Sequence, residues 1–459
     1  MPEDHSPPPG IRLAAKLCSR EDLALITHHL SHPNLYKSEY QYRIQTDTDF
    51  QSRAQTVKSL LATHQHVLRR LESLAEFKFI DLFAGIGGFR LSGNNVGGEC
   101  LFTSELDKAA QLSYFHNYGE IPFGDITQIT KDSKTMAIIP DHDVLCGGFP
   151  CQAFSVAGKQ EGFNDPRGNL FFNIKAIAKE KKPKILFLEN VRNLEKHDEG
   201  RTFTRIKEEL EVTLRKETRG RHFYKVFSCV LDSSNFGAPT SRIRIYIIAI
   251  RKDLVKLRGD SYTNAFSHEL LKLTRHRGAC RTVRDILQKD ITPELLSRIT
   301  IVREHQLLDK FKDIDDVHYL LTTPQTPQIR PVQFARYGKG RQGERIYKID
   351  GHAITFSAYG GGIAARTGAY DINGVIRKLA PRECARCMGF QKLNADGSYT
   401  DMDTESLEGL GVSLMQQYKQ FGNSVVVNVV QHLFQLIKES WLKTQTESPH
   451  DLPHDRLGG

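Results

Sequence analysis

The sequence lacks any run of about eighteen apolar residues, the length that a membrane-spanning helix requires. Its first ten residues, MPEDHSPPPG, contain no apolar stretch, so we also expect no secretory signal. Hydrophobic residues make up only 39% of the 459-residue chain. Together these features exclude integral membrane proteins and predict a soluble protein.

Cysteine is also sparse, and the eight cysteines are too scattered to suggest a disulfide framework. We therefore expect a reducing, cytoplasmic location. Cys384 and Cys387 form one Cys-x-x-Cys pair, but a structural zinc site needs four ligands. On a helix the two thiols would line one face. We expect both in the core, and no metal site.

Positive charge is concentrated in one part of the chain. The net charge is +9, and residues 251–345 contain 19 Lys and Arg against 12 Asp and Glu. Such a segment can be a solvated basic face or a nucleic-acid-binding surface. The charge alone does not decide between these alternatives.

Buried strands alternate with helical segments from residue 77 onward. The expected strands cover 77–83, 100–105, 142–146, 185–190, 227–232 and 243–250, with helices at 107–119 and 169–182 between them. Alternation of this kind predicts an α/β fold with a doubly wound, mainly parallel sheet.

Changes in composition and in the pattern of apolar residues divide the chain into five segments. Residues 1–76 are expected to be a helical extension with a disordered start, and residues 77–255 the sheet domain. Residues 256–375 are basic and turn-rich, which predicts a smaller, irregular domain. Residues 376–440 look helical from Arg377 onward and return to the sheet domain. Residues 441–459 are expected to be a loose tail.

Acidic and glycine residues gather at the predicted ends of the first strands. The turn that contains Gly85 and Gly87 joins a strand to a helix, where backbone amides can face a ligand. Glu105 ends the next strand and can bind both hydroxyls of a ribose. Asp125 is expected to end a third strand. This arrangement predicts a site for an adenosine-containing cofactor.

A second group of residues suits covalent chemistry. Cys151 follows Pro150 in the segment CGGFPCQAFS, just beyond a predicted strand, although a buried structural cysteine is the simpler alternative. Glu189 ends another strand and could act as a general acid, oriented by Asn190. Arg242 and Arg244 alternate along a strand and therefore face the same side.

In this order, the motifs resemble those of the DNA (cytosine-5)-methyltransferases over residues 77–438. The matching segments are DLFAGIGGF, GGFPCQAFS, ENVRNL, FGAPTSRIRIYIIA, RKLAPRECARCMGF and QQYKQFGNSVVVNVV. The resemblance implies a Rossmann-like methyltransferase fold, S-adenosyl-L-methionine as cofactor and double-stranded DNA as substrate. Residues 256–375 occupy the place of the family's target-recognition domain.

The resemblance also implies a role for each site residue. Cys151 would attack C6 of a cytosine flipped out of the duplex, while Glu189 protonates or hydrogen-bonds N3. Arg244 would hold O2 of the base, and Arg242 would help to position the loop. The residues expected at the cofactor are Phe83, Gly85, Gly87, Glu105, Asp125, Pro150, Leu170, Asn423 and Ser424.

Three positions depart from the usual pattern of the family. Thr240 stands where glutamine is common, and Leu106 stands where a tryptophan often lies against the cofactor adenine. Ala153 replaces the more common proline of the cysteine loop. None of these departures removes a group that does the chemistry.

Residues 338–379 resemble the GCGC-modifying, HhaI-type branch of the family. The positions that match its base-contacting residues are Gln342, Arg345, Ser357, Tyr359 and Gly362. Arginine can bind guanine O6 and N7 together. We therefore expect a site beginning 5′-GC, GCGC in the simplest case. Residues 256–330 have no counterpart in that compact branch, so a related site such as GCNGC is the alternative.

Two other functions are open from the sequence: a tRNA methyltransferase of the same fold, and a catalytically inactive DNA-binding regulator. The long basic region argues against the first, and the intact Cys151 and Glu189 argue against the second. Besides DNA, we expect a cognate restriction endonuclease that acts on the same site without stable contact. The protein is expected to be a monomer, associated with the nucleoid in a bacterial cytoplasm.

Overall fold

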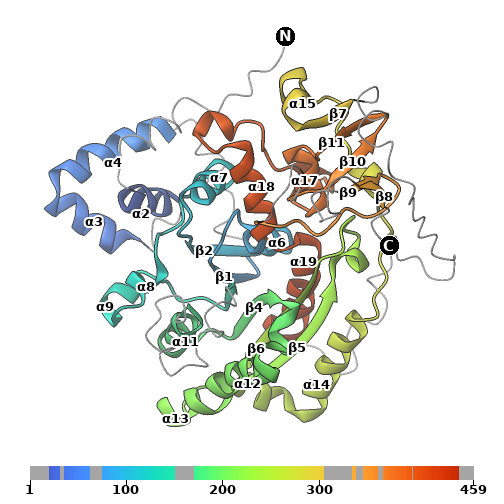
Figure 1. Cartoon of the computed structure of the whole chain (residues 1–459). Helices are drawn as coiled ribbons and strands as arrows, with labels where there is room; N and C mark the ends of the chain where they lie inside the picture. Colours follow the sequence, from blue (N-terminus) through green and yellow to red (C-terminus); the bar gives the residue numbers. More distant parts are fainter. Residues whose placement is uncertain are drawn as a thin grey trace.

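In the computed structural model, the described residues are 20–31, 36–61, 75–149, 170–303, 333–336, 345–359, 364, 366–394 and 396–443. Figure 1 shows a large central sheet flanked by helices, with a smaller sheet beside it. Among the described residues, no helix is long and apolar enough to cross a membrane.

The central sheet has six strands in the order β2-β1-β3-β4-β6-β5. Strands β1 to β4 are parallel, and β6 runs antiparallel to both of its neighbours. The six strands whose ranges were predicted from the sequence are all present, and the mainly parallel fold is confirmed. Their bounds are β1 Phe77–Leu82, β2 Gly98–Ser104, β3 Val144–Gly148, β4 Ile185–Val191, β5 Tyr224–Asp232 and β6 Ile243–Arg251.

Both faces of the sheet are apolar, because successive residues along each strand point to opposite sides. In β4, Phe187 faces one apolar cluster, whereas its neighbours Leu186 and Leu188 face the other. Phe434 of α19 (Val427–Ile437) packs with its ring 5.0 Å from that of Phe187. On the other face, α11 (Leu170–Lys181) buries Phe171. Helices on both faces make the sheet doubly wound.

The remaining helices of this domain are short. They are α6 Gly88–Asn95, α7 Lys108–Tyr118, α8 Ile126–Ile129, α9 Ser133–Met136, α12 Arg201–Glu208, α13 Leu214–Glu217 and α18 Leu414–Asn423. The N-terminal extension contains α2 Arg20–Ser31, α3 Lys37–Thr46 and α4 Thr48–Leu61, as its helical prediction required.

The segment after β6 is not irregular at its start, so that expectation was wrong. It forms the long helix α14 (Lys252–Leu273), interrupted at Gly259, whose φ is 83°. The rings of Tyr262 and Phe266 pack at 5.4 and 5.5 Å from Trp441, and Phe266 lies 5.2 Å from Phe227 of β5. This helix therefore packs on the large sheet, and we propose that the recognition domain begins after it.

The smaller sheet contains five strands in the order β7-β11-β10-β9-β8. It is reached through α15 (Pro293–Ile299). Its strands are β7 Thr300–Arg303, β8 Gln333–Arg336, β9 Arg345–Lys348, β10 Ala369–Ile372 and β11 Val375–Arg377. The predicted helix from Arg377 onward is wrong at its start, because Arg377 ends β11 and the helix α17 (Pro381–Cys387) begins at a proline. A hairpin of β12 Gln391–Leu393 and β13 Tyr399–Asp401 follows.

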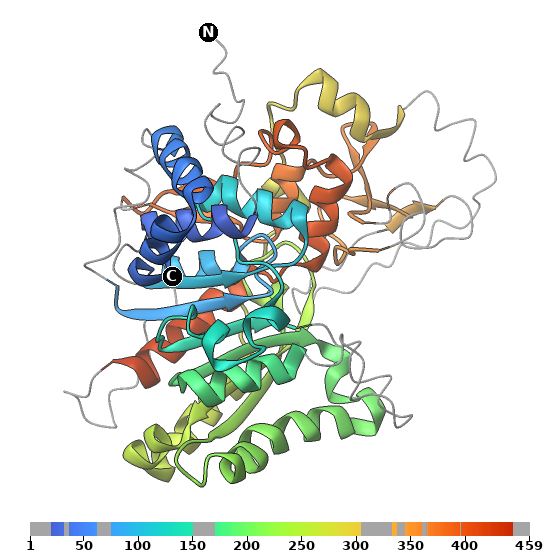
Figure 2. The ribbon, with the colours of Figure 1, turned by 90° about the vertical axis from the view of Figure 1, so that its left-hand side faces the viewer.

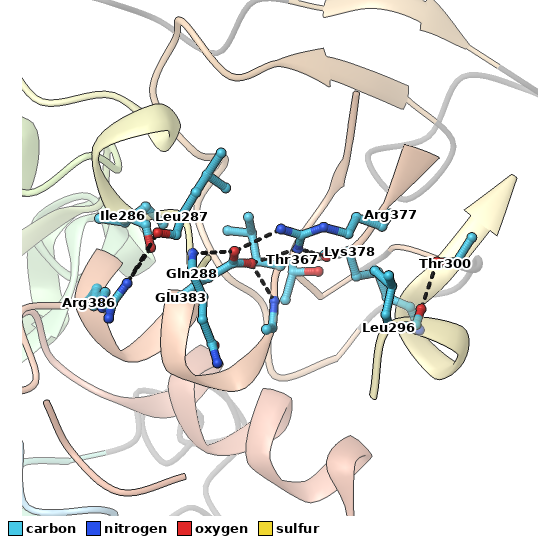
Figure 3. A network of polar contacts seen from close by, with 12 residues as sticks. Ile286, Leu287, Gln288, Leu296, Thr300, Thr367, Arg377, Lys378, Glu383 and Arg386 are labelled. Atoms are coloured by element: carbon cyan, nitrogen blue, oxygen red, sulfur yellow. Dashed lines mark hydrogen bonds and ion pairs between the residues drawn. The ribbon is translucent and has the colours of Figure 1, made fainter. Parts of the chain in front are cut away.

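A buried ion pair connects the smaller sheet to the C-terminal helices (Figure 3). Both terminal nitrogens of Arg377 donate to Glu383, at 2.7 and 2.8 Å. The same carboxylate accepts from the amides of Gln288 and Ala380. Nearby, Arg386 donates to the carbonyl oxygens of residues 286 and 287. Four donors to one buried carboxylate fix the segment before α15 against α17.

Candidate active site

The first strand of the large sheet ends in a turn with a left-handed backbone. Phe83, Gly85 and Gly87 have φ angles of 57°, 56° and 83°. Gly87 is the N-cap of α6, and a Cβ on it would lie 2.4 Å from Cε2 of Tyr118. At Gly85, nothing lies within 4 Å of the Cβ position. The turn is thus packed on one side and open at Gly85, where a ligand can approach the backbone.

Glu105 follows β2 and connects the neighbouring loops at this edge. Its Oε2 accepts a hydrogen bond from the amide of Gly85 (2.8 Å), and Oε1 accepts one from the amide of Asp107 (2.7 Å). Burial raises the pKa of Glu105, against the opposing effect of these two amides. Asp107 is also paired with Lys419 of α18 at 2.8 Å. Since a carboxylate offers about four lone-pair positions, Glu105 keeps acceptor capacity for a ligand.

Asp125 does not end a strand, so that prediction was wrong. Phe123 makes only a single parallel bridge, with Ser104, before the chain turns into α8, where Asp125 is the N-cap. The segment is too short to extend the sheet. The Phe123 amide donates to the carbonyl of Thr103, and its carbonyl accepts from the amide of Glu105. These bonds keep Asp125 at the same sheet edge as Glu105.

The C-terminal helices close on this turn from the other side. A Cβ on Gly88 would lie 2.5 Å from Cγ2 of Val425 and 3.3 Å from Oγ of Ser424. Ser424 is buried, whereas Asn423, the last residue of α18, is exposed. Leu170 opens α11 and, like Phe83, packs partly buried against the apolar cluster on one face of the sheet. The structure therefore brings Ser424 to the glycine turn, and Asn423 precedes it in the chain.

A buried ion pair occupies the end of β4. Oε1 of Glu189 lies 3.0 Å from Nε of Arg244, and the two side chains are only 11% and 16% exposed. Burial raises the pKa of Glu189, while Arg244 and Arg242 act in the opposite direction. Gly148 of β3 is the register partner of Glu189, and a Cβ there would lie 3.2 Å from Glu189 Oε2. Glu189 thus lies beside the strand that leads to Cys151.

Asn190 does not orient Glu189, in contrast to the prediction. Adjacent residues of a strand point to opposite faces. Its Nδ2 donates to the carbonyl of Phe149 at 2.8 Å, and its Oδ1 accepts from the amide of Val191. Asn190 therefore anchors the chain at Phe149, two residues before Cys151.

Arg242 contacts backbone rather than a pocket. It is 3% exposed, and it donates to the carbonyl oxygens of Phe356 (3.0 Å) and Gly422 (2.9 Å). Burial lowers the pKa of Arg242 to about 9. Thr240 reinforces the same junction through a hydrogen bond from Oγ1 to the carbonyl of Ile354 (3.1 Å). Arg242 thus links the backbone at Phe356 to the backbone at Gly422, near the end of α18.

Gly422 is a position that sequence reasoning missed. A Cβ on it would lie 2.3 Å from the amide nitrogen of Ala358, in the loop that carries two predicted recognition residues. The signal in the sequence was a glycine inside a helical segment, just before Asn423. Only glycine permits this close approach. The loop of residues 357–359, called the recognition loop, therefore touches the backbone of α18 at Gly422, next to the predicted cofactor residues Asn423 and Ser424.

The predicted recognition residues that the structure describes lie at the loop and the small sheet. Arg345 is exposed at the start of β9. Tyr359 is 73% exposed, and its amide donates to Oγ of Ser357 at 3.3 Å. Pro150, Cys151, Gln342 and Gly362 lie outside the described residues.

The Cys-x-x-Cys pair lies in the core, as expected. Cys384 and Cys387 are fully buried in the apolar cluster that includes α19. Within the described ranges, no group of three or more His, Cys, Asp or Glu residues could hold a metal ion.

A doubly wound sheet with a glycine turn after β1, an acidic residue after β2 and an ion-paired carboxyl at the end of β4 defines a methyltransferase-like enzyme. The chain belongs to the C-5 cytosine-specific DNA methylase family, whose model matches residues 77–439. It is therefore a DNA (cytosine-5)-methyltransferase, which modifies C5 of cytosine in DNA.

Curated proteins with similar sequences are also methyltransferases. The chain is 44% identical over 364 residues to the type II methyltransferase M.HhaI of Haemophilus parahaemolyticus, covering 79% of this chain and 94% of that enzyme. It is 36% identical over 376 residues to M.HpaII of Haemophilus parainfluenzae, covering 78% and 87%. The fold resembles the solved S. pombe Dnmt2 methyltransferase, with a TM-score of 0.53 and 19% identity over 79% of this chain and 99% of that one.

Proposed function

We propose that the protein transfers a methyl group from S-adenosyl-L-methionine to the cytosine of a short duplex site beginning 5′-GC, GCGC in the simplest case. The observation that carries this proposal is the Glu189–Arg244 pair beside β3, the strand that leads to Cys151. The similarity to M.HhaI over most of the chain supports the site.

The residues of the cofactor edge fit an adenosine-containing methyl donor. The backbone is open at Gly85, Glu105 retains acceptor capacity, and the apolar side chain of Leu106 next to it is 70% exposed. An exposed leucine beside a ribose-binding acid suits a flat adenine ring. The donor supplies the electrophilic methyl group when bound, and the other residues that would hold it are Phe83, Gly87, Asp125, Pro150, Leu170, Asn423 and Ser424.

The chain's own residues then perform the covalent steps. The base must leave the helix stack before its ring can react. The thiolate of Cys151 bonds to C6, and Glu189 gives a proton or a hydrogen bond to N3, so that negative charge does not accumulate on the ring. After methyl transfer to C5, loss of the C5 proton and of the thiol restores the aromatic ring.

Burial suits Glu189 to this role, because its raised pKa favours the protonated carboxyl. Arg244, already in contact with Glu189, would hold O2 of the base. Arg242 acts as a positioning residue, since its contacts are to backbone carbonyls. Asn190 positions the chain entering the cysteine loop through Phe149.

The proposal extends to the biological setting. A type II restriction endonuclease that cuts the same site would act without stable contact, and the methyltransferase would work as a monomer in a bacterial cytoplasm, at the nucleoid. The names of the type II relatives support this setting.

Bisulfite sequencing of plasmid DNA from cells that express the protein tests the proposal. Conversion-resistant cytosines should occur at every copy of one 5′-GC motif with the wild-type protein and at none with Cys151→Ser. Protected cytosines in a motif without 5′-GC would show that the recognition loop does not carry the proposed specificity. An absence of protected cytosines in DNA, with methylation of tRNA instead, would overturn the substrate.

A further inference from the structure

The N-terminal extension lies outside the family match, which begins at residue 77, yet it shares a core with the catalytic sheet. Leu23, Ile26, Tyr36 and Phe50 belong to the same apolar cluster as residues of β1, β2 and β4. Figure 2 shows these helices in dark blue against the part of the sheet drawn in lighter blue. The described helices of the extension, α2 to α4, thus share the core of the catalytic domain.

The contacts of the extension converge on the outer edge of the sheet. β2 is the edge strand. The hydroxyl of Tyr36 donates a hydrogen bond to the carbonyl oxygen of Leu101 in this strand, at 2.5 Å. The amide of Ile121 donates to Oγ1 of Thr27 at 3.3 Å. The ring of His28 stacks on Phe123, with centroids 4.8 Å apart and planes 22° apart.

The residues contacted in this way support the cofactor edge. The carbonyl of Phe123 accepts from the amide of Glu105, and the carboxylate of Glu105 accepts from Gly85 of the glycine turn. Asp125 follows two residues later. A continuous path of contacts therefore runs from His28 through Phe123 to Glu105.

A buried charge cluster lies beside this path. Glu120 forms an ion pair with Arg90 of α6 at 2.8 Å, and Nδ1 of His28 lies 3.8 Å from Glu120. Arg90 also donates from its amide to Asp81 of β1. Through Glu120, the extension also borders the helix that starts at the glycine turn.

We propose that the extension sets the affinity of the cofactor site, with His28 and Tyr36 as positioning residues that hold Phe123 and β2 in place for Glu105 and Asp125. This inference rests on the proposed cofactor site. It assigns to residues 20–61 a role in binding the methyl donor rather than in binding DNA.

The test measures binding of S-adenosyl-L-homocysteine by calorimetry to the full-length protein and to single variants of it. Tyr36→Phe removes only the hydroxyl that donates to the carbonyl of Leu101. We expect the affinity for S-adenosyl-L-homocysteine to fall by about three- to tenfold, the size typical of one buried hydrogen bond. Tyr42→Phe makes the same chemical change at a tyrosine of α3 that is 61% exposed, and it should leave the affinity within twofold.

The stacking contact is tested separately. His28→Ala should weaken S-adenosyl-L-homocysteine binding, and His28→Phe, which keeps a ring on Phe123, should restore most of it. The affinity for a duplex without cofactor should stay within twofold for all variants. Melting of the ligand-free proteins separates a local effect on the site from general loss of stability.

The outcomes separate this inference from the proposed function. If the wild-type protein binds no S-adenosyl-L-homocysteine, the cofactor assignment itself is wrong. If the wild type binds and Glu105→Ala abolishes binding, but Tyr36→Phe and His28→Ala bind like wild type, the role of the extension is wrong. Weaker binding to DNA with unchanged cofactor affinity would assign the extension to DNA instead and also overturn the inference.

Discussion

Nε of Arg244 lies 3.0 Å from Oε1 of Glu189, and both side chains are almost fully withdrawn from solvent. The two residues come from neighbouring antiparallel strands, β6 and β4, and face the same side of the sheet. Taking a carboxyl and a guanidinium out of water together is costly unless each stabilises the other. Burial raises the pKa of Glu189 against the opposing effect of Arg244, and the contact between them holds the carboxyl beside the strand that leads to Cys151.

Replacement of Glu189 by glutamine should lower the rate of methyl transfer by about a hundredfold or more, because glutamine cannot deliver a proton to N3. Single-turnover assays at neutral pH measure this rate. DNA affinity should be unchanged. Glu195→Gln, at an exposed carboxyl six residues further along, is the matched control and should transfer at the wild-type rate. An unchanged rate in Glu189→Gln would make Glu189 a structural residue.

The difference in melting temperature between the wild-type protein and Glu189→Gln should also depend on pH. A carboxyl whose pKa is raised in the folded state adds stability below its ordinary value of 4.5, and this contribution is lost as the pH rises through the folded pKa. The melting temperature of the wild type, relative to Glu189→Gln, should therefore fall between pH 4.5 and neutrality. A difference that stays constant or rises over this range would mean that Arg244 outweighs burial.

Gly422→Ala should destabilise the protein by about 1–3 kcal/mol, the usual cost of overpacking. Alanine inside a helix normally stabilises it by about 0.5–1 kcal/mol relative to glycine. The sign of the change in unfolding free energy therefore distinguishes overpacking from ordinary helix propensity. Here the new Cβ would meet the backbone of Ala358 at 2.3 Å. Gly124→Ala, where nothing lies within 4 Å, is the control. Urea unfolding that shows a stabilised Gly422→Ala would contradict the close approach.

Arg345→Ala should relax the sequence preference at one base pair by about 1–3 kcal/mol, the worth of a bidentate contact to guanine. Arg345→Lys keeps the charge but loses the paired geometry, so it should relax the preference nearly as much while preserving overall affinity better. Competition between duplexes that differ at one base pair measures both effects. Equal weakening on all duplexes would identify Arg345 as a phosphate contact.

The strands of the large sheet were predictable because each is a short buried run with its own local signal, whereas the short strands of the smaller sheet were not predicted. The long helix α14 was missed because Gly259 interrupts it and its composition is basic and polar, so its apolar face becomes evident only against Trp441 and Phe227. The start of α17 was misplaced because residues before a proline favour extended backbone, and Ala380, which precedes Pro381, is extended with φ −67° and ψ 155°.

At the candidate site, the residue types were predictable but several of their contacts were not. The strands that carry Glu189 and Arg244 were predicted, but the contact between the two side chains was not. The role of Asn190 depends on which face of the strand it occupies, and that of Gly422 depends on a loop 64 residues away in sequence, at Ala358. Both contacts arise from tertiary packing. A glycine inside a helical segment marks Gly422 as unusual but does not reveal its partner, and nothing near Asn190 in the sequence points to Phe149.

The most direct test of the account is covalent trapping on DNA. A duplex that carries 5-fluorocytosine in the first GC step of GCGC should form a denaturation-resistant complex with the protein in the presence of S-adenosyl-L-methionine, because fluorine at C5 prevents the proton loss that releases the thiol. Peptide mapping should locate the adduct at Cys151, and Cys151→Ser should form none. Full methylation activity without a trapped complex, or an adduct at another cysteine, would contradict the proposed mechanism.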